Sequence, residues 1–557
     1  MGRMGRMGRM GRMGRMGRMG RMGRMGRMGR PKLTLHYPPI LPILPISPIV
    51  PARLARPARP ARPYGMHLFE PNATALLLLT AGGLLAVSVI FSRASARFSM
   101  PVVLIFLIIG IIAGAPHLGG ITFTNVPFAF RLGTTALVLI LFDGGLNTPM
   151  SAVRLTWRPA SILATFGVAG TCGVLAFVAH LVGFSWPEAL LLAAIVSSTD
   201  AAMVFSVLRG SGLHLKRRVG ATLEIESGIN DPMAFMLTLA FTQNLLATGS
   251  LDPWLAPLDI LLQIAVGLVS GVLIGIGGRR VLAQLRVASG LYVAFTVALA
   301  FLAFGLATLA HGSGFLSVYV AGVVLGNGPL PLRTGLFRVH DALAWLSQIT
   351  MFLVLGLLVN TDGLMQVWWM GLGLALVLAC VARPIAVWLC LLPFRYPVRE
   401  TAYISWIGLR GAVPIVLATF PLLAGAPGSE RIFLVVFFIV VVSTILPGST
   451  VAWATRRLKL EAPEPPAPPA VLNIESRQQL TGDLLSFYVD DGLAVAGVQL
   501  AELSLPEGSA VTLLIRGLDL IPPRGSTTIM PGDHVYIVTR PEDRGFVQLL
   551  FGHPEED

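Results

Sequence analysis

The stretch Leu223-Glu-Ile-Glu-Ser-Gly-Ile-Asn-Asp-Pro-Met-Ala-Phe-Met-Leu-Thr-Leu-Ala-Phe241 has the apolar character of a membrane span. Glu226, Ser227, Asn230 and Asp231 interrupt its apolar residues. A charged side chain at the centre of a bilayer costs about 2.5–3.5 kcal/mol on insertion scales, and such groups persist mainly where ions, protons or polar substrates must pass. The stretch therefore indicates a transport protein.

The composition of the whole chain is that of a membrane protein. The 557 residues are 54% hydrophobic and 13% charged, with a mean hydropathy of +0.74. These values are typical of a polytopic all-α membrane protein rather than a soluble enzyme. Cys172, Cys380 and Cys390 lie in apolar segments without metal-ligand spacing, so we interpret them as small apolar fillers.

The formal charge of +14 comes from the N-terminal head of the chain. Residues 1–65 contribute +15, whereas the rest of the chain sums to −1. Ten Met-Gly-Arg triplets and a Pro-rich stretch make up this low-complexity head, which lacks the apolar core of a signal peptide. We expect residues 1–65 to be non-native or disordered, with the biological start at Met66. A basic tail that binds anionic lipid is the alternative.

Apolar runs predict 13 membrane spans within a transmembrane domain at residues 66–455. The runs are 73–92, 100–115, 129–142, 160–184, 188–208, 219–247, 258–278, 290–310, 314–327, 342–359, 368–392, 400–424 and 431–453. Each connection is numbered by the span that precedes it. The odd-numbered connections and the C-terminal flank carry 18 basic residues, whereas the even-numbered connections carry only Arg131 and Arg431. The positive-inside rule therefore predicts a cytoplasmic C-terminal domain and an external N-terminus at Met66.

Thirteen spans fit two six-span repeats of inverted topology around a linker span, and this scheme pairs the fifth span with the twelfth. The fifth span contains Ile195-Val-Ser-Ser-Thr-Asp200-Ala-Ala-Met203, and the twelfth contains Trp406-Ile-Gly-Leu-Arg410-Gly-Ala-Val-Pro414. Both stretches place polar or helix-breaking residues at mid-span. Such paired interruptions predict discontinuous helices around an ion site at the membrane midplane.

The polar residues of the sixth span fall on two helix faces. Ser227 and Asp231 share one face, and Glu226 and Asn230 share another. Glu226 and Asp231 are separated by about 140° around the helix axis, so they are expected to have different roles. One carboxylate can stay ionised beside an arginine. The other must be able to bind and release a cation or a proton.

Two arginines lie within predicted spans, Arg383 in the eleventh and Arg410 in the twelfth. Either could neutralise Glu226, because a buried ion pair that loses one partner costs about 3–5 kcal/mol. Asp231 has no obvious permanent cation, so it is the better transport carboxylate, at which a proton and a metal ion compete. Asp200 supplies a second carboxylate next to hydroxyl side chains, and oxygen ligands suit hard cations.

These motifs resemble the monovalent cation:proton antiporter-1 family, of the sodium/proton exchanger type, over residues 75–453. The matching motifs are Ser-Thr-Asp200, Glu226-Ser-Gly-Ile-Asn-Asp231-Pro, Ala-Arg383 and Gly-Leu-Arg410-Gly-Ala. The resemblance implies a homodimer that exchanges one cation for one proton. It also implies alternating access, by a rocking or elevator motion of a core bundle.

The resemblance assigns roles to individual residues. It implies that Asp231 is the transport carboxylate and binds the monovalent cation or the proton. It further implies that Asn230 holds the carboxylate of Asp200, and that Glu226 forms a structural ion pair with Arg383.

The remaining candidates are hydroxyl groups and one arginine. Thr199 and Ser227 are candidate ion and proton ligands, although each hydroxyl could instead bond to the carbonyl four residues back. Arg410 is interpreted as support for the helix break, and Asp143 as an interfacial residue. Many relatives have proline directly after the span-five aspartate, where this chain has Ala201, and this leaves the geometry of the break open.

The C-terminal part of the chain has a soluble character. Residues 456–470 form a Pro-rich linker, and residues 471–557 show strand and turn patterns. The predicted elements are strands at Leu484–Val489, Ala510–Arg516 and Asp533–Thr539, and a helix at Val498–Leu503. This region resembles an RCK C-terminal (TrkA-C) domain, which implies regulation by dimerisation or by an unidentified cytoplasmic ligand. It lacks Gly-x-Gly-x-x-Gly, so no nucleotide cofactor is expected.

The combined prediction is a secondary active potassium/proton antiporter of a bacterial inner membrane, and not an enzyme. Its partners would be potassium or sodium ions, protons and the lipid bilayer, with no nucleic acid, and it would contribute to cation, pH and cell-volume homeostasis. Potassium is favoured because the tail resembles that of a potassium-preferring subgroup. A sodium/proton antiporter is the nearest alternative. An RCK-regulated potassium channel is remote because the chain lacks a Thr-Val-Gly-Tyr-Gly filter, and the absence of His-Glu-x-x-His disfavours an intramembrane hydrolase.

Overall fold

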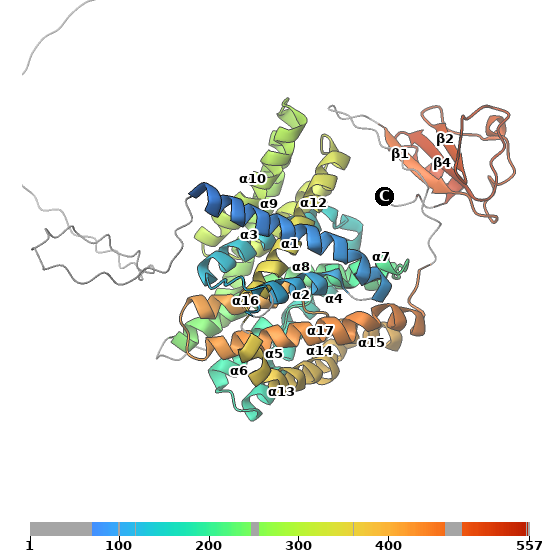
Figure 1. Ribbon diagram of the computed structural model, residues 1–557. Helices are drawn as coiled ribbons and strands as arrows, with labels where there is room; N and C mark the ends of the chain where they lie inside the picture. Colours follow the sequence, from blue (N-terminus) through green and yellow to red (C-terminus); the bar gives the residue numbers. More distant parts are fainter. Residues whose placement is uncertain are drawn as a thin grey trace, which may run out of the picture. The chain divides into compact units, whose positions relative to one another are not determined.

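The computed structural model describes residues 70–98, 101–116, 119–246, 255–359, 361–462, 482–552 and residue 554. The predictions for the head at 1–65, for Met66 and for most of the linker at 456–470 fall outside these residues. Where the structure describes the chain, it shows a helical membrane domain and a small β-rich domain near the C-terminus (Figure 1).

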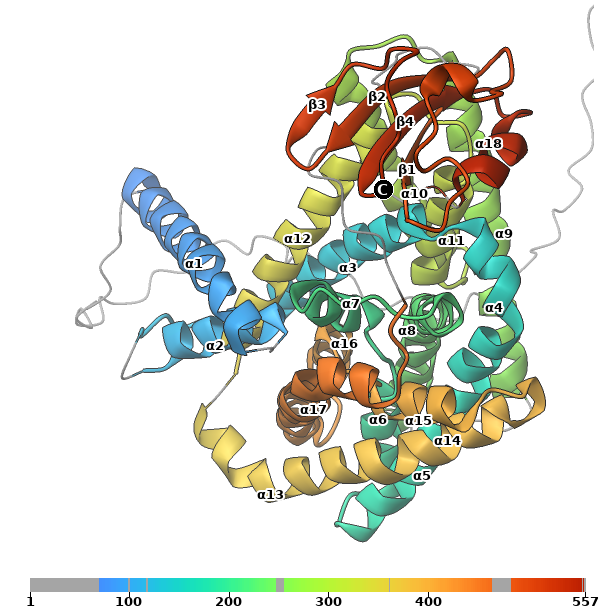
Figure 2. The same cartoon turned by 90° about the vertical axis from the view of Figure 1, so that its right-hand side faces the viewer.

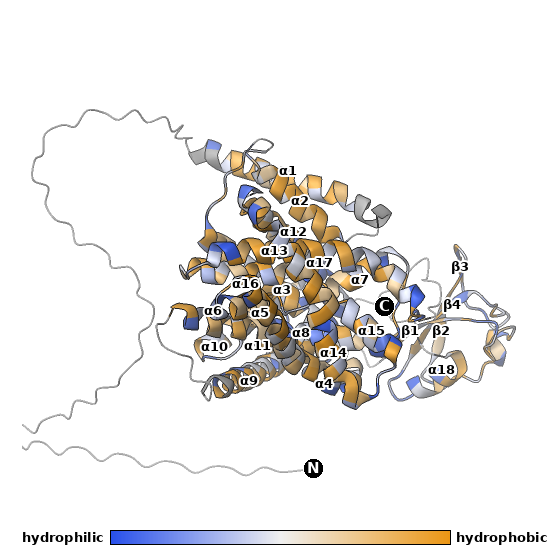
Figure 3. Cartoon of the chain, turned by 90° about the horizontal axis from the view of Figure 1, so that it is seen from below, coloured by the Kyte–Doolittle hydropathy of each residue, from blue (hydrophilic) through white to orange (hydrophobic). Residues whose placement is uncertain are grey.

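The membrane domain consists of apolar α-helices, several of which are interrupted (Figure 3). In chain order they are α1 Glu70–Phe98, α2 Val102–Gly114, α3 Val126–Asn147, α4 Met150–Ile162, the π-helical turn η1 Leu163–Gly167, α5 Val168–Leu181, α6 Trp186–Ile195, α7 Ala201–Gly210, α8 Arg217–Leu246, α9 Leu255–Gln284, α10 Ser289–Leu309, α11 Gly314–Gly326, α12 Arg333–Leu357, α13 Thr361–Val377, the π-helical turn η2 Leu378–Ala382, α14 Arg383–Leu391, α15 Val398–Trp406, α16 Ala412–Leu423 and α17 Ser429–Arg457.

Each predicted span overlaps one helix or one interrupted helix of this series. Within the described ranges, 8 helices are long and apolar enough to cross a membrane, and α2, α6, α7, α11 and α16 are shorter apolar helices. A helix of about 20 residues is needed to cross a bilayer, so the short helices satisfy this length only in combination with neighbouring segments. The number of 13 crossings stays a prediction.

The membrane helices pack as two groups (Figure 2). The first group, here termed the scaffold bundle, contains α1, α2, α3 and α9 to α12. The second group, here termed the core bundle, contains α4 to α8 and α13 to α17. The two groups meet chiefly where α3 packs on α16 and where α11 packs on α8.

Close glycine contacts relate the two halves of the scaffold bundle. Gly322 is the ninth residue of α11, and a Cβ placed there would lie 2.6 Å from the carbonyl oxygen of Phe142 on α3. Gly110 is the ninth residue of α2, and a Cβ there would overlap the carbonyl oxygen of Leu353 on α12. The equivalent helices α2 and α11 thus each approach a helix of the other half, α12 and α3, backbone to backbone. The interrupted segments α4–α5 and α13–α14 correspond in the same way, since each contains a π-helical turn. Both correspondences agree with inverted repeats.

The C-terminal domain is an antiparallel sheet with one helix. Its elements are β1 Asp483–Tyr488, β2 Ala510–Arg516, β3 Asp519–Ile521, β4 Asp533–Thr539 and α18 Arg544–Phe551, and the strand order is β1-β4-β2-β3. The three predicted strands are present. The predicted helix at Val498–Leu503 was wrong, because the amides of Leu500 and Ala501 donate to carbonyls of Thr527 and Gly525, which leaves one 3-10 turn at Leu500–Glu502.

Candidate ion-binding site

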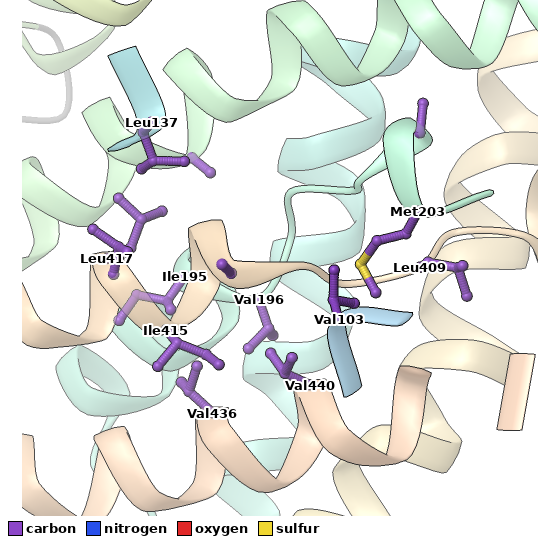
Figure 4. Packing of buried hydrophobic residues seen from close by; sticks show 14 of the residues in the cluster. Val103, Leu137, Ile195, Val196, Met203, Leu409, Ile415, Leu417, Val436 and Val440 are labelled. Carbon is purple, nitrogen blue, oxygen red and sulfur yellow. The ribbon is translucent and has the colours of Figure 1, made fainter. Parts of the chain in front are cut away.

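Two broken helices cross inside the core bundle. α6 ends at Ile195 and α7 begins at Ala201, while α15 ends at Trp406 and α16 begins at Ala412. The backbone amide of Asp200 donates to the carbonyl oxygen of Leu409 over 2.8 Å, so the two irregular segments are bonded to each other. Figure 4 shows Val196 and Leu409 among the apolar side chains that bury this crossing. The prediction of discontinuous helices is confirmed.

Asp200 explains how the fifth span resumes without a proline. Its carboxylate accepts a hydrogen bond from the backbone amide of Met203 over 3.1 Å and so caps the N-terminus of α7. A Cβ on Gly411, at the start of α16, would overlap the Asp200 carboxylate, so glycine is needed for this approach. The carboxylate therefore lies close to the positive N-terminal ends of α7 and α16.

Arg410 serves the C-terminal ends of the other two half-helices, α6 and α15. Its Nε donates to the carbonyl oxygen of Val196 over 2.8 Å, and its Nη1 donates to the carbonyl oxygen of Gly408. These carbonyls follow α6 and α15, where the last turn leaves acceptors without intrahelical donors. The buried guanidinium thus places a positive charge at two negative helix ends.

The sixth span, α8, is bonded to the break in the fifth span. The Ser227 hydroxyl donates to the carbonyl oxygen of Thr199 over 2.9 Å and accepts from the amide of Ala201 over 3.2 Å. The amide of Asn230 donates to the Thr199 hydroxyl oxygen over 2.6 Å. The Ser227 hydroxyl therefore donates to Thr199 rather than to the carbonyl four residues back, and the Thr199 hydroxyl accepts from Asn230. Asn230 bonds to Thr199, whereas the resemblance implied a bond to its neighbour Asp200.

Glu226 and Arg383 form a bidentate ion pair. Arg383 Nη1 lies 2.6 Å from Glu226 Oε1, and Nη2 donates to Oε2 over 2.9 Å. Their side chains are 2% and 0% exposed, so the guanidinium offsets a fully desolvated carboxylate. The tertiary structure thus selects Arg383 over Arg410 as the partner of Glu226.

Three buried oxygens near the crossing, Asp231 Oδ1, Asn230 Oδ1 and Ser198 Oγ, make no well-formed hydrogen bond with the described residues, although the Ser198 hydroxyl lies near enough to Asp231 to interact with its carboxylate. Buried polar atoms are normally satisfied, so unpaired ones call for a water, an ion or a proton. Carboxylate, amide and hydroxyl oxygens are the ligands that hard cations prefer.

Asp200 and Asp231 line a cavity with a volume of about 670 Å³. The cavity wall also includes Asp143, Glu224 and Asp341 together with Arg209 and Arg338, so acidic groups outnumber basic ones. Asn147 at the end of α3 and Thr334 near the start of α12 line it as well, and these helix ends border odd-numbered connections. The wall therefore extends from the crossing toward one side of the membrane domain.

Two acidic residues that the sequence did not assign to the ion site line this cavity. Asp143, interpreted from sequence as interfacial, lines the cavity and accepts a hydrogen bond from Asn147 over 3.1 Å. Glu224 was missed altogether. Its seven-residue separation from Asp231 was the available signal, because that spacing places both carboxylates on one face of a helix.

Broken helices that cross beside buried carboxylates, at the end of a cavity in a helical membrane bundle, define a secondary transporter for cations. Residues 83–457 match the family described as "Sodium/hydrogen exchanger, transmembrane", and residues 484–551 match the TrkA-C domain. The chain belongs to the sodium/hydrogen exchanger family.

Several relatives agree with this assignment. The chain is 39% identical over 479 residues to the K(+)/H(+) antiporter NhaP2 of Shewanella sp. (strain MR-4). The aligned region covers 85% of this chain and 83% of the relative. It is also 39% identical over 478 residues to the K(+)/H(+) antiporter NhaP of Alkalimonas amylolytica, with coverages of 85% and 82%. The solved sodium proton antiporter MjNhaP1 from Methanocaldococcus jannaschii shares the fold, with a TM-score of 0.60 and 21% identity over 69% of this chain and 99% of that chain.

Proposed function

We propose that this protein is a potassium/proton antiporter that exchanges one potassium ion for one proton. The balance of buried charge carries the proposal. Glu226 and Asp231 are buried together with Arg383 and Arg410, and the half-buried Asp200 lies beside them at the crossing, so these five groups carry one net negative charge when all are ionised. An uncompensated charge inside a membrane protein is costly, so one potassium ion or one proton must restore neutrality. Alternate binding of the two at Asp231 gives electroneutral exchange.

The site geometry supports different roles for the polar residues. Asp231 and Asp200 would bind the cation, since both carboxylates line the cavity. The unpaired Asn230 Oδ1 is available as a further ligand. Ser227 and Thr199 have their hydroxyls engaged across the break, so they would position the site.

We favour potassium over sodium as the transported cation because of what the relatives are named. The two relatives that are 39% identical are named K(+)/H(+) antiporters. The Na(+)/H(+) antiporter NhaG of Bacillus atrophaeus is 29% identical over 426 residues. Because both ions use the same oxygen ligands and differ mainly in size, a sodium/proton antiporter stays the alternative.

The location and the motion are proposed on the same basis. The basic odd-numbered connections would face the cytoplasm of a bacterium, with the N-terminus outside, so the cavity would face inward. The protein would act as a homodimeric transporter and not as an enzyme. The core bundle would move relative to the scaffold bundle, because the crossing and its bonds lie within the core bundle.

The TrkA-C domain would regulate this motion through the start of its linker. The amide of Lys216 donates to the carbonyl oxygen of Leu460 over 3.0 Å, and the amide of Ala462 donates to the carbonyl oxygen of His214 over 2.9 Å. These bonds attach residues 460–462 to the loop at 211–216, which joins α7 to α8. A cytoplasmic ligand or a dimer contact of the TrkA-C domain would then act on both helices that carry the site.

Exchange in proteoliposomes tests the proposal. Under an imposed pH gradient, the wild type is expected to exchange potassium for protons, and Asp231→Asn to lose this exchange. Asp259→Asn on α9 is the matched control, because its carboxylate is exposed and bonds only to Gln263 among the described residues. Retained exchange in Asp231→Asn would remove this residue from the role. A series with lithium, sodium and potassium decides the cation.

A further inference from the structure

Glu224 is a second carboxylate on the helix that carries Asp231. The two residues are seven positions apart, which corresponds to two turns and about 10 Å along α8. Both line the same cavity, and Ser227 and Gly228 line it between them. One face of α8 therefore presents a carboxylate at each end of this short stretch of cavity wall.

The hydrogen bonds of Glu224 allow it to be either ionised or protonated. The Thr148 hydroxyl lies 3.0 Å from Glu224 Oε1, 2.7 Å from the carbonyl oxygen of Gly144 and 3.3 Å from the Tyr319 hydroxyl. A hydroxyl has one proton to donate and lone pairs to accept with. Thr148 can donate to an ionised Glu224, or accept from a protonated one while donating to Gly144.

Glu224 also has no fixed cation among the residues that the structure describes. The ion pairs formed among the described residues do not include it, although Arg209 and Arg338 line the same cavity. Glu226, two residues further along α8, is neutralised by Arg383. A cavity-lining carboxylate without a permanent partner is free to bind an ion that arrives from solution.

We propose that Glu224 is an access carboxylate, which takes up the cation at the cytoplasmic side and passes it along α8 to Asp231. This inference rests on the proposed function. Asp143 lines the same cavity, but it belongs to the scaffold bundle and is bonded to Asn147. Glu224 lies between the start of α8 and Asp231, so a cation that enters through this cavity passes it, whereas a cation that arrives from the opposite side does not.

The expected effect is on one side of the membrane only. A unit charge acting over about 10 Å, at an effective dielectric constant of about 20, changes the local cation concentration by roughly tenfold, and here the affected concentration is that in the cavity through which cytoplasmic cations enter. Glu224→Gln is therefore expected to raise KM for potassium roughly tenfold when potassium is supplied from the cytoplasmic side. KM from the opposite side and the maximal rate are expected to stay within about twofold of the wild type.

The experiment compares everted and right-side-out vesicles that contain the full-length protein. Glu400→Gln at the start of α15 is the matched control, because it removes a carboxylate that does not line the cavity. Glu224→Asp is expected to recover most of the affinity. Thr148→Val removes the hydroxyl and keeps the carboxylate, so it separates a structural bond from a charge effect.

The outcomes separate this inference from the proposed function. An equal rise of KM from both sides, or the same loss in Thr148→Val as in Glu224→Gln, would show that Glu224 only holds the junction of α3 and α4. An unchanged KM would exclude Glu224 from the path. A wild type without potassium exchange would overturn the proposed function itself, whatever the Glu224 variants do.

Discussion

Arg383 holds both carboxylate oxygens of Glu226, over 2.6 and 2.9 Å, in a part of the core bundle where neither side chain is exposed by more than 2%. The pair joins α14 to α8, two helices from different halves of the chain. It leaves Asp231 on the same helix without a fixed cation, which separates the structural carboxylate from the one that faces the cavity.

Breaking this pair is expected to destabilise the protein more than removing it whole. Glu226→Gln and Arg383→Met each leave an unpaired buried group, which costs about 3–5 kcal/mol. The double variant Glu226→Leu/Arg383→Met leaves no buried charge and is expected to recover most of that loss. Thermal unfolding in detergent measures the effect. A double variant that unfolds below both single variants would contradict a purely structural role for the pair.

The glycine contacts of the scaffold bundle predict a difference between adjacent positions. Gly145→Ala would drive a methyl group into the carbonyl oxygen of Tyr319 on α11, and such overpacking costs about 1–3 kcal/mol. Gly144→Ala is the matched control, because a Cβ there has no atom within 4 Å. The temperature of thermal unfolding should therefore be lower for Gly145→Ala than for the wild type, and it should stay near the wild-type value for Gly144→Ala. Equal shifts in both variants would argue against the close approach of α3 and α11.

The attachment of the linker predicts an effect on regulation. Ala462→Pro removes the amide that donates to His214, whereas Glu461→Pro removes no hydrogen bond that the structure shows between residues 460–462 and the loop at 211–216. Deleting the TrkA-C domain after residue 462 is expected to change the exchange rate in proteoliposomes. In Ala462→Pro the same deletion should change the rate less, because one of the two hydrogen bonds of the attachment is already lost. A full effect of the deletion in the Ala462→Pro background would contradict coupling through this loop.

Much of the fold is predictable because its signals are local. Apolar runs locate the helices, since the length and polarity of each segment act within that segment. The break in the fifth span, next to Asp200, was also predictable from local sequence. Three hydroxyl residues and an aspartate compete with the helix for backbone hydrogen bonds and then cap the next helix, all within a few positions. The predicted helix at Val498–Leu503 failed for the opposite reason, because its amides found acceptors in a distant loop.

The sequence alone determined that the chain is a cation transporter with broken helices and carboxylates in its sixth span, because hydropathy and helix capping depend on neighbours in the chain. Only the tertiary structure decided that Glu226 pairs with Arg383, that Asn230 bonds to Thr199, and that Arg410 serves two helix ends. It alone placed Glu224 in the cavity of Asp231. These relations depend on the rotation of each helix against helices far away in sequence, which the packing of the whole bundle sets.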